Sequence, residues 1–210
     1  MKKKKKSKED LDIDLFEKFF PLKGFDRKEL RIPEICLAAV QNNFEVLEYV
    51  LEAHKTPELC LVAVQQDGIA LQYVPKALRT QELSLIAVQN NGLALEYVPE
   101  ALLKTKRPLA LELCLAAVKQ NSDAIAFVPE SLRTMDLCLA AVKNDGFKLL
   151  YVPEELKTLE LCHAAVKQYG LALKYAPKEL KKTPKLRKIF VRHCVKEALK
   201  ELDNDKFIFP

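Results

Sequence analysis

The chain lacks most of the features that mark membrane, secreted or lipid-anchored proteins. Tryptophan is absent, and the 210 residues include only five glycines and three histidines. No apolar run approaches the roughly 20 residues of a membrane-spanning helix, so we expect no membrane span. No apolar segment follows the basic N-terminus, which argues against a secretory signal peptide. Position 2 is Lys rather than Gly, which excludes N-myristoylation.

Residues for catalysis and metal binding are equally scarce. Catalysis needs a positioned nucleophile, a base and a stabilising group, but the chain has only four serines and three histidines. The paired spacing Cys-x-x-Cys is absent, and the adjacent His193 and Cys194 would point in different directions from a helix. His54 lies beside a junction where a surface loop is expected. We therefore predict no catalytic residue, no cofactor and no metal, and a protein that is not an enzyme.

A repeated segment dominates what is present. The last Val of each copy falls at positions 40, 64, 88, 118, 142 and 166, so four spacings are 24 residues and one is 30. The longer spacing indicates a six-residue insertion within residues 103–110. Repeats of this length that cannot bury their apolar faces alone form stacks, so the sequence predicts an all-α solenoid of six two-helix repeats rather than a closed helical bundle.

The second copy shows how each repeat is expected to fold. Thr56 is a good N-cap, and Pro57 suits the first position of a helix. Gly68 is expected to break this helix, and Pro75 to end the second one, since a residue before proline resists the α conformation. Glutamates and one aspartate near the starts of the first helices are explained by the helix dipole. An aromatic ladder is predicted to pack in the core, although base stacking is the alternative; it comprises Tyr49, Tyr73, Tyr97, Phe127, Tyr151 and Tyr175.

The flanks divide the chain into four parts. Residues 1–10 form a polybasic, low-complexity tail that is predicted to be disordered. An N-terminal cap helix is expected within residues 11–32, the repeats occupy residues 33–183, and a cap helix and tail follow in residues 184–210. Five cysteines recur at one repeat position and are predicted to be small buried residues in a reducing compartment, with oxidation between neighbours as the alternative; these are Cys36, Cys60, Cys114, Cys138 and Cys162.

The repeat resembles a known family over residues 33–181. The segment from Glu160 to Lys181 reads Glu-Leu-Cys-His-Ala-Ala-Val-Lys, then Gln-Tyr-Gly, then Leu-Ala-Leu-Lys-Tyr-Ala-Pro-Lys-Glu-Leu-Lys. This pattern is similar to the family called domain of unknown function 4116, which occurs in effector-like proteins of intracellular bacteria; leucine-rich variant repeats are a weaker analogy. The resemblance implies a helical-repeat fold and a protein-binding role, and it supplies no catalytic residues. The first copy departs from the pattern at Phe44 and Leu51.

Charge is unevenly distributed along the chain. The net charge of the chain is +5, and six N-terminal lysines contribute +6, so the remaining residues sum to −1. These lysines are Lys2, Lys3, Lys4, Lys5, Lys6 and Lys8. Residues 9–58 carry a net −6 and residues 157–200 a net +9. The lysine run is expected to be a solvated tail, with weak, salt-sensitive contact to nucleic acid or an anionic surface as the alternative.

These observations favour a non-catalytic protein-binding scaffold, with a cytoplasmic location or delivery into a host cytosol. The alternative is a nucleic-acid-binding repeat protein that uses the basic C-terminal repeats. Irregular positions in a regular array are the best candidates for partner contacts. One group lies in the insertion, where we expect a loop, and the other in the last repeat, where His163 replaces a Leu; together they are Lys104, Lys106, Arg107, His163, Lys167, Tyr169 and Lys174.

Overall fold

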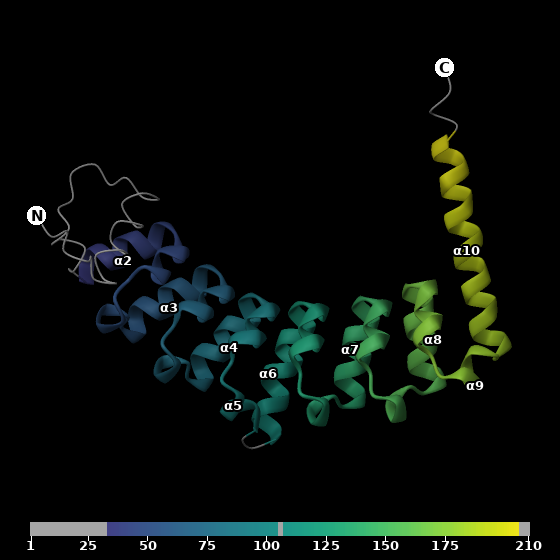
Figure 1. Cartoon of the computed structure of the whole chain (residues 1–210), viewed down its shortest axis with the longest axis horizontal. Coiled ribbons are helices and arrows are strands. Elements are labelled where there is room, and N and C mark those ends of the chain that lie inside the picture. Colours follow the sequence, from purple (N-terminus) through teal and green to yellow (C-terminus); the bar gives the residue numbers. More distant parts are fainter. Residues whose placement is uncertain (1–32, 105–106, 206–210) are drawn as a thin grey trace, which may run out of the picture. The chain divides into compact units, whose positions relative to one another are not determined.

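The structure is a computed structural model of the chain, and it describes residues 33–104 and 107–205 (Figure 1). Each repeat begins with an α-helix, and no strand occurs in these residues. The prediction of an all-α repeat fold is therefore confirmed. The polybasic tail in residues 1–10 and the cap helix expected in residues 11–32 lie outside the described part. The first helices are α2 (Pro33–Asn42), α3 (Pro57–Gln66), α4 (Gln81–Asn90), α6 (Arg107–Gln120), α7 (Met135–Asn144) and α8 (Leu159–Gln168).

The second element of each repeat is a 3₁₀ helix. Six residues between an extended cap such as Asp67 and an extended residue before proline such as Val74 leave room for two turns of three residues. These elements are η2 (Phe44–Glu48), η4 (Gly68–Tyr73), η6 (Gly92–Tyr97), η7 (Ser122–Phe127), η9 (Gly146–Tyr151) and η11 (Gly170–Tyr175).

A third, shorter helix completes each repeat, which the sequence analysis did not foresee. In four copies it is a single 3₁₀ turn, which in three of them starts directly after the proline. The third elements are η3 (Glu52–His54), η5 (Lys76–Leu78), α5 (Glu100–Lys104), η8 (Glu130–Leu132), η10 (Glu154–Leu156) and α9 (Lys178–Lys181), and the long helix α10 (Pro184–Asp205) follows the last one.

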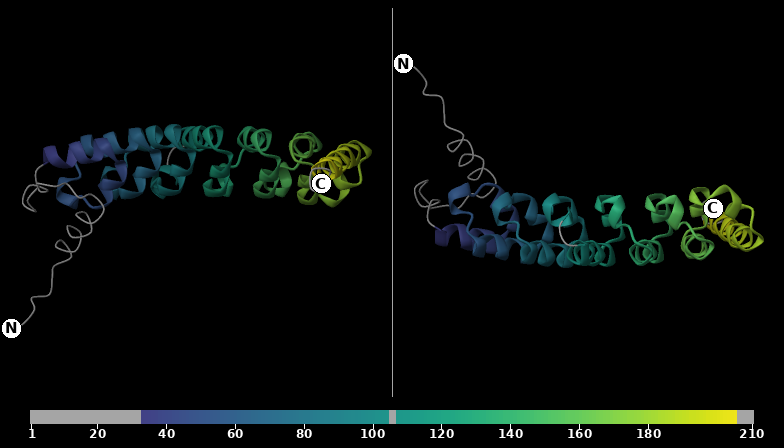
Figure 2. Two further views of the ribbon diagram at one scale, coloured as in Figure 1. Left: turned by 90° about the horizontal axis from the view of Figure 1, so that it is seen from above. Right: turned by 90° about the horizontal axis from the view of Figure 1, so that it is seen from below.

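The chain divides into two compact units, residues 1–104 and 105–210. Within the first, α2, α3 and α4 pack side by side, and η2, η4 and η6 form a second layer beside them. Within the second, α6, α7 and α8 pack in the same way beside η7, η9 and η11 (Figure 2). Each α-helix is too short to be stable alone, so the stacking of neighbouring repeats supplies its stability.

The recurring glycine has a different role from the one expected. The α-helix ends at Gln66 and is followed by Asp67 in an extended conformation, so Gly68 does not form a left-handed helix cap. Gly68 is instead buried against the backbone of Ala87 in the next repeat, where a Cβ atom would overlap the carbonyl group. Gly146 meets Ala165 in the same way. The glycine therefore allows the 3₁₀ layer to approach the next α-helix closely.

Side-chain caps define the start of both main helices. Thr56 Oγ1 accepts a hydrogen bond from Leu59 N at 3.2 Å, and Thr80 Oγ1 accepts one from Leu83 N at 3.2 Å, which confirms the predicted N-caps. Asp67 caps η4 by accepting from Ile69 N at 2.9 Å. In the fifth repeat Thr134 makes no such bond, so the cap is not uniform.

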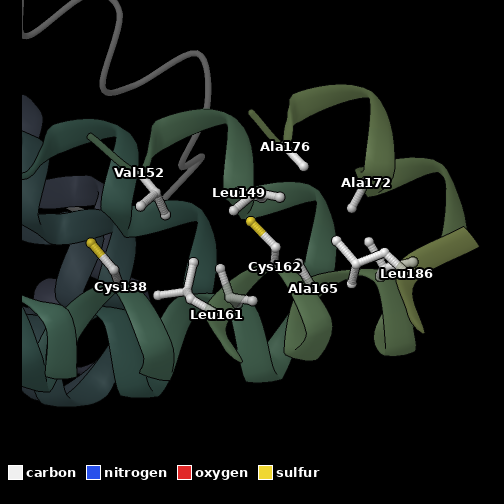
Figure 3. Close-up of a cluster of buried hydrophobic side chains, with 11 residues drawn as sticks. Cys138, Leu149, Val152, Leu161, Cys162, Ala165, Ala172, Ala176 and Leu186 are labelled. Carbon is white, nitrogen blue, oxygen red and sulfur yellow. The ribbon is translucent and has the colours of Figure 1, made fainter. Parts of the chain in front are cut away.

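The core contains the cysteines, as predicted. Cys36, Cys60, Cys114, Cys138 and Cys162 are buried and free of disulfides. Burial raises the thiol pKa of Cys60, Cys114, Cys138 and Cys162 to about 11. Figure 3 shows Cys138 and Cys162 beside Leu149, Leu161 and Leu186 in the second unit. Leu186 comes from α10, so this helix covers the apolar end of the last repeat.

The described part of the insertion region, residues 103–104 and 107–110, is helical where we expected a loop, and residues 105–106 lie outside the described residues. Residues 107–110 begin α6, which has 14 residues where the other first helices have 10. Before α6, α5 is a five-residue α-helix where four of the other repeats have one 3₁₀ turn. Pro108 lies in the first turn of α6, where a missing amide N–H costs nothing. The additional residues therefore lengthen α5 and α6.

Candidate functional site

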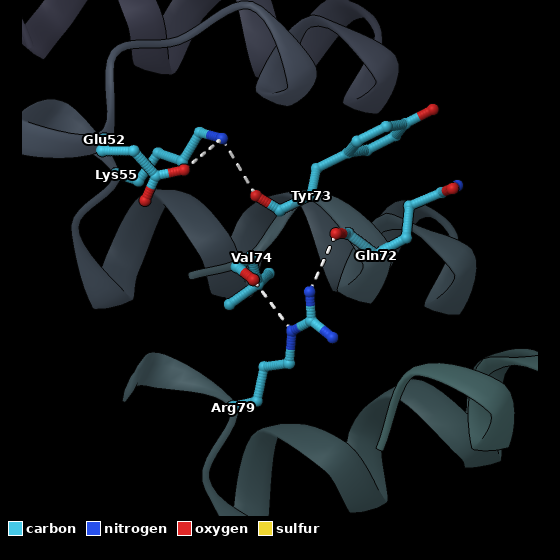
Figure 4. A network of polar contacts seen from close by, with 6 residues as sticks. All are labelled: Glu52, Lys55, Gln72, Tyr73, Val74 and Arg79. Carbon is cyan, nitrogen blue, oxygen red and sulfur yellow. Dashed lines mark hydrogen bonds and ion pairs between the residues drawn. The ribbon is translucent and has the colours of Figure 1, made fainter. Parts of the chain in front are cut away.

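A basic residue at one repeat position links successive 3₁₀ helices by hydrogen bonds. Arg79 donates from Nε to Val74 O at 2.8 Å, from one terminal nitrogen to Gln72 O at 2.9 Å, and from the other to Tyr97 O in the next repeat at 2.9 Å. Figure 4 shows Arg79 and Lys55 on either side of Tyr73 and Val74; Lys55 donates from Nζ to Tyr73 O at 3.1 Å. These bonds satisfy carbonyl groups at the C-terminal ends of the 3₁₀ helices.

Equivalent residues in the second unit work in the same way. Arg133 donates from Nε to Val128 O at 3.0 Å and from a terminal nitrogen to Tyr151 O at 2.8 Å. The repeated basic residue at this position was visible in the sequence but was not singled out. Because its charge is used internally, this part of the basic character is structural and does not mark a binding site.

A groove between α7 and α8 contains part of the predicted contact surface. It has a volume of about 560 Å³ and is lined by Leu139, Lys143, Glu160, His163, Ala164, Lys167 and Gln168. His163 and Lys167 lie one helical turn apart on α8, and both were predicted as contacts. Lys143 and Ala164 were not predicted. Lys143 and Lys167 are exposed, whereas His163 is half-buried.

The first unit has a smaller groove at the equivalent place. It lies between α3 and α4, has a volume of about 220 Å³, and is lined by Pro57, Leu61, Leu78, Thr80, Glu82, Leu83 and Ile86. Leu61 matches Leu139, Glu82 matches Glu160, and Ile86 matches Ala164 in the repeat register. Ala164 has a smaller side chain than Ile86, and the groove of the second unit has the larger volume. A comparison of the copies at the position of Ile86 and Ala164 could have indicated from the sequence that the two grooves differ.

Tyr169 and Lys174 belong to a different surface from His163 and Lys167. The Tyr169 ring packs edge-on against Phe147, with centroids 6.3 Å apart, and against His193 of α10 at 5.9 Å. The Lys174 ammonium lies 4.7 Å from the centroid of the Tyr175 ring and 5.8 Å from that of Phe147. Tyr169 also replaces the Asn or Asp that caps the 3₁₀ helix elsewhere, and it makes no cap. The contacts explain its presence as packing between the last repeat and α10.

Lys148 is a further irregularity that sequence reasoning missed. It is buried at a position where Ala70, Ala94, Ala124 and Ala172 stand in other copies. Its Nζ pairs with Asp123 and lies 3.0 Å from Asp145 Oδ2. Burial lowers its pKa, but the hydrogen bonds to the two carboxylates outweigh this and raise the pKa overall. The group is therefore a charged, paired link between two repeats.

Among the predicted contact residues of the insertion, Lys104 belongs to the unit that does not contain the groove. Lys104 ends α5 in the first unit, and its Nζ lies 2.6 Å from Glu100 Oε1. Arg107 is the first residue of α6 in the second unit. Lys106 lies outside the described residues. Their role as partner contacts remains a prediction.

The described residues contain neither a cluster of metal ligands nor a membrane-spanning helix. Within residues 33–104 and 107–205, no three His, Cys, Asp or Glu side chains cluster as metal ligands would. Among the helices of the same residues, none combines the length and apolar character needed to cross a bilayer.

The stacked repeats define the chain as an all-α repeat protein. The family model described as Domain of unknown function (DUF4116) matches residues 33–79, 80–133 and 134–181, so the chain belongs to this family. Each match spans two of the 24-residue repeats, and two of the matches begin at the threonines Thr80 and Thr134. No curated protein and no solved structure shows significant similarity to the chain.

Proposed function

We propose that this protein is a non-catalytic binding scaffold whose main contact is the groove between α7 and α8, and that its partner is an acidic helical segment of another protein. The observation that carries this proposal is the change of residues along an otherwise regular surface. At the positions of Gln65, Leu85 and Gln89, the second unit carries Lys143, His163 and Lys167. These substitutions are not needed for packing, because the other copies fold without them.

The lining of the groove determines the chemistry of the partner. Leu139 and Ala164 offer an apolar floor, while Lys143 and Lys167 add positive charge at the C-terminal ends of α7 and α8. Lys119 occupies the same position on α6, which extends the row of lysines. A helix with an aliphatic stripe beside Asp and Glu would match this pattern, since helix-in-groove recognition uses such anchors. Complementary charge would chiefly raise the association rate and the specificity.

A triple variant tests this proposal. Lys143→Gln, His163→Leu and Lys167→Gln, combined in the full chain, restore residues found in other copies and should leave the fold unchanged. Helical peptides selected on the wild-type chain from a displayed library should be rich in Asp and Glu beside Leu. Their Kd should rise by about tenfold or more for the triple variant, since several interface contacts are lost together.

A matched control changes the first unit. Gln65→Ala with Gln89→Ala alters the same repeat positions and should leave the Kd of the selected peptides unchanged. Equal binding by the triple variant would refute the groove as the contact site. In that case a Lys104→Ala, Lys106→Ala and Arg107→Ala variant would test the insertion.

Nucleic-acid binding is the second candidate, favoured by the row of lysines. Phosphate contacts release counterions, so such binding should weaken steeply as salt rises. We expect labelled single- and double-stranded nucleic acid to bind weakly, with much of the binding lost after deletion of residues 1–8. Tight binding that survives both the deletion and physiological salt would favour the nucleic-acid function over the protein scaffold.

A cytoplasmic location, or delivery into a host cytosol, forms part of the same proposal. The buried free thiols of Cys60, Cys114, Cys138 and Cys162 support it, because cysteines without disulfides at a repeated core position suit a reducing compartment.

A further inference from the structure

The helix α10 has two apolar faces, and only one of them is covered. Leu186 is fully buried against the last repeat, and Ile189 and Phe190 pack partly against the same cluster. A second stripe consists of Val191, Val195 and Leu199, which are 55%, 53% and 56% exposed. Their spacing of four residues places them on one side of the helix along about 12 Å. Aliphatic side chains so exposed in a row indicate a contact surface.

Basic residues surround this stripe. Lys185, Arg187, Lys188, Arg192 and Lys196 are all exposed, and residues 184–196 include no Asp or Glu. Lys188, Arg192 and Lys196 follow the same four-residue spacing as the aliphatic stripe and lie next to it. A helix with an aliphatic stripe bordered by Lys and Arg is typical of segments that lie in the interface of an anionic bilayer.

The position of α10 leaves the stripe accessible to a flat surface. α10 packs against α8 and η11, and it forms the last layer of the second unit (Figure 1). The aliphatic stripe lies on the side of the helix away from Leu186, so the repeats do not cover it. Long Lys and Arg side chains can extend from such a helix to phosphate groups while their stems remain in apolar surroundings.

We propose that the outward face of α10, formed by Val191, Val195 and Leu199 with their basic neighbours, docks on an anionic lipid bilayer. The bilayer supplies both an apolar layer for the aliphatic residues and negative charge for the five basic ones. A second copy of the chain fits less well, because symmetric antiparallel pairing around Val195 would bring Arg192 and Lys196 of the two copies together. Nucleic acid would match the charge but would leave the aliphatic stripe uncovered. This surface is separate from the groove between α7 and α8.

The absence of tryptophan from the sequence permits a direct test. Val195→Trp places a sole tryptophan on the stripe, and Leu150→Trp places one at a position of η9 that is 45% exposed. Both full-length variants are mixed with phosphatidylcholine vesicles, with or without phosphatidylserine. Fluorescence of the Val195→Trp variant should shift to shorter wavelength only with phosphatidylserine and should be quenched by bromine-labelled lipid. The Leu150→Trp variant should show neither effect.

Charge variants provide the second measurement. In the Val195→Trp background, Lys188→Gln, Arg192→Gln and Lys196→Gln together should lower the partition coefficient by about tenfold or more, since each basic residue near an anionic surface adds affinity. Lys119→Gln, Lys143→Gln and Lys167→Gln remove the same charge from the groove side and should have a much smaller effect. Circular dichroism and thermal melting check that each variant is folded.

Three outcomes would overturn the proposal. If the protein sediments with anionic vesicles while the tryptophan of the Val195→Trp variant stays exposed to water, the N-terminal lysine run alone binds lipid. If the blue shift appears without vesicles and grows with protein concentration, the face is an interface between two copies. If the protein does not bind the anionic vesicles at all, the face has some other role.

Discussion

The two compact units use the same repeat but present different surfaces. In the first, the groove between α3 and α4 is small and bordered by Leu61 and Ile86. In the second, the groove between α7 and α8 is larger and bordered by Lys143, His163 and Lys167. The buried positions hardly change, since Ala63, Val64, Ala141 and Val142 are all fully buried at matching places. Packing therefore constrains the inside of the repeat, and differences between units accumulate on the outer helical face.

The strongest test of this comparison places a charge at a buried position of each unit. Cys60→Asp and Cys138→Asp should each lower the free energy of unfolding by about 3–5 kcal/mol, because the carboxylate would be buried without a partner. Chemical denaturation followed by circular dichroism measures the loss. The exposed control Lys143→Asp should change stability by less than about 0.5 kcal/mol. A small effect of Cys138→Asp would show that the core of the second unit is looser than the structure indicates.

Alkaline pH should lower the stability of the second unit more than that of the first. A thiol whose pKa is raised by folding stabilises the folded state below the unfolded pKa, near 9, and this contribution is lost as pH rises toward the folded value of about 11. The second unit has three such thiols, Cys114, Cys138 and Cys162, whereas Ser84 replaces one cysteine in the first unit.

Hydrogen exchange read by mass spectrometry gives this comparison unit by unit. From pH 9 to 10, after correction for the intrinsic exchange rate, protection should fall more in residues 107–205 than in residues 33–104. Substitution of the three thiols by Ala should remove this loss from residues 107–205, so that the first unit, which keeps Cys36 and Cys60, loses more protection than the second. Equal loss of protection in both units would mean that the thiols do not control it.

The two arginines that link the 3₁₀ helices by hydrogen bonds should differ by a smaller amount in their contribution to stability. Arg79→Ala removes hydrogen bonds to three carbonyl groups and should cost about 2–4 kcal/mol, while Arg133→Ala removes bonds to two and should cost about 1–3 kcal/mol. Urea unfolding of the two variants measures both losses. Replacement by Lys should recover only part of each loss, because Lys lacks the planar arrangement of donors. An Arg133→Ala variant less stable than Arg79→Ala would contradict the count of bonds.

The smallest expected effect is a gain of stability in the first unit. The Ser84 hydroxyl is buried and has no hydrogen-bond partner within the described part of the chain. Ser84→Cys restores the residue of the other copies and should raise stability by about 1 kcal/mol, since an unsatisfied hydroxyl is removed from the core. A rise in Tm of a few degrees would be measured by differential scanning calorimetry. The reverse change, Cys138→Ser, should lower the Tm by a similar amount.

Part of the candidate site was predictable from the sequence, because it depends on comparing copies. His163 replaces the Leu of the other copies, and Lys167 replaces the Gln of the first three copies. Both residues lie on α8 and line the same groove. Tyr169 and Lys174 are equally irregular in sequence, but their side chains pack against Phe147, Tyr175 and His193. Proximity in sequence therefore did not determine which residues share a surface, since the two helical layers of one repeat present different faces.

The sequence by itself determined the period, the α-helices, the threonine caps and the buried cysteines, because each follows from local propensity or from repetition of an apolar pattern. Tertiary structure decided what the intervening segments became. The six residues from Gly68 to Tyr73 form a 3₁₀ helix because Gly68 must fit against the next repeat, and residues 107–110 lengthen α6. Tertiary structure also decided that Arg79 and Arg133 form hydrogen bonds to carbonyl groups of the next repeat, while Lys143 and Lys167 remain exposed. Only the stacking of one repeat on the next determines which carbonyl groups a side chain can reach.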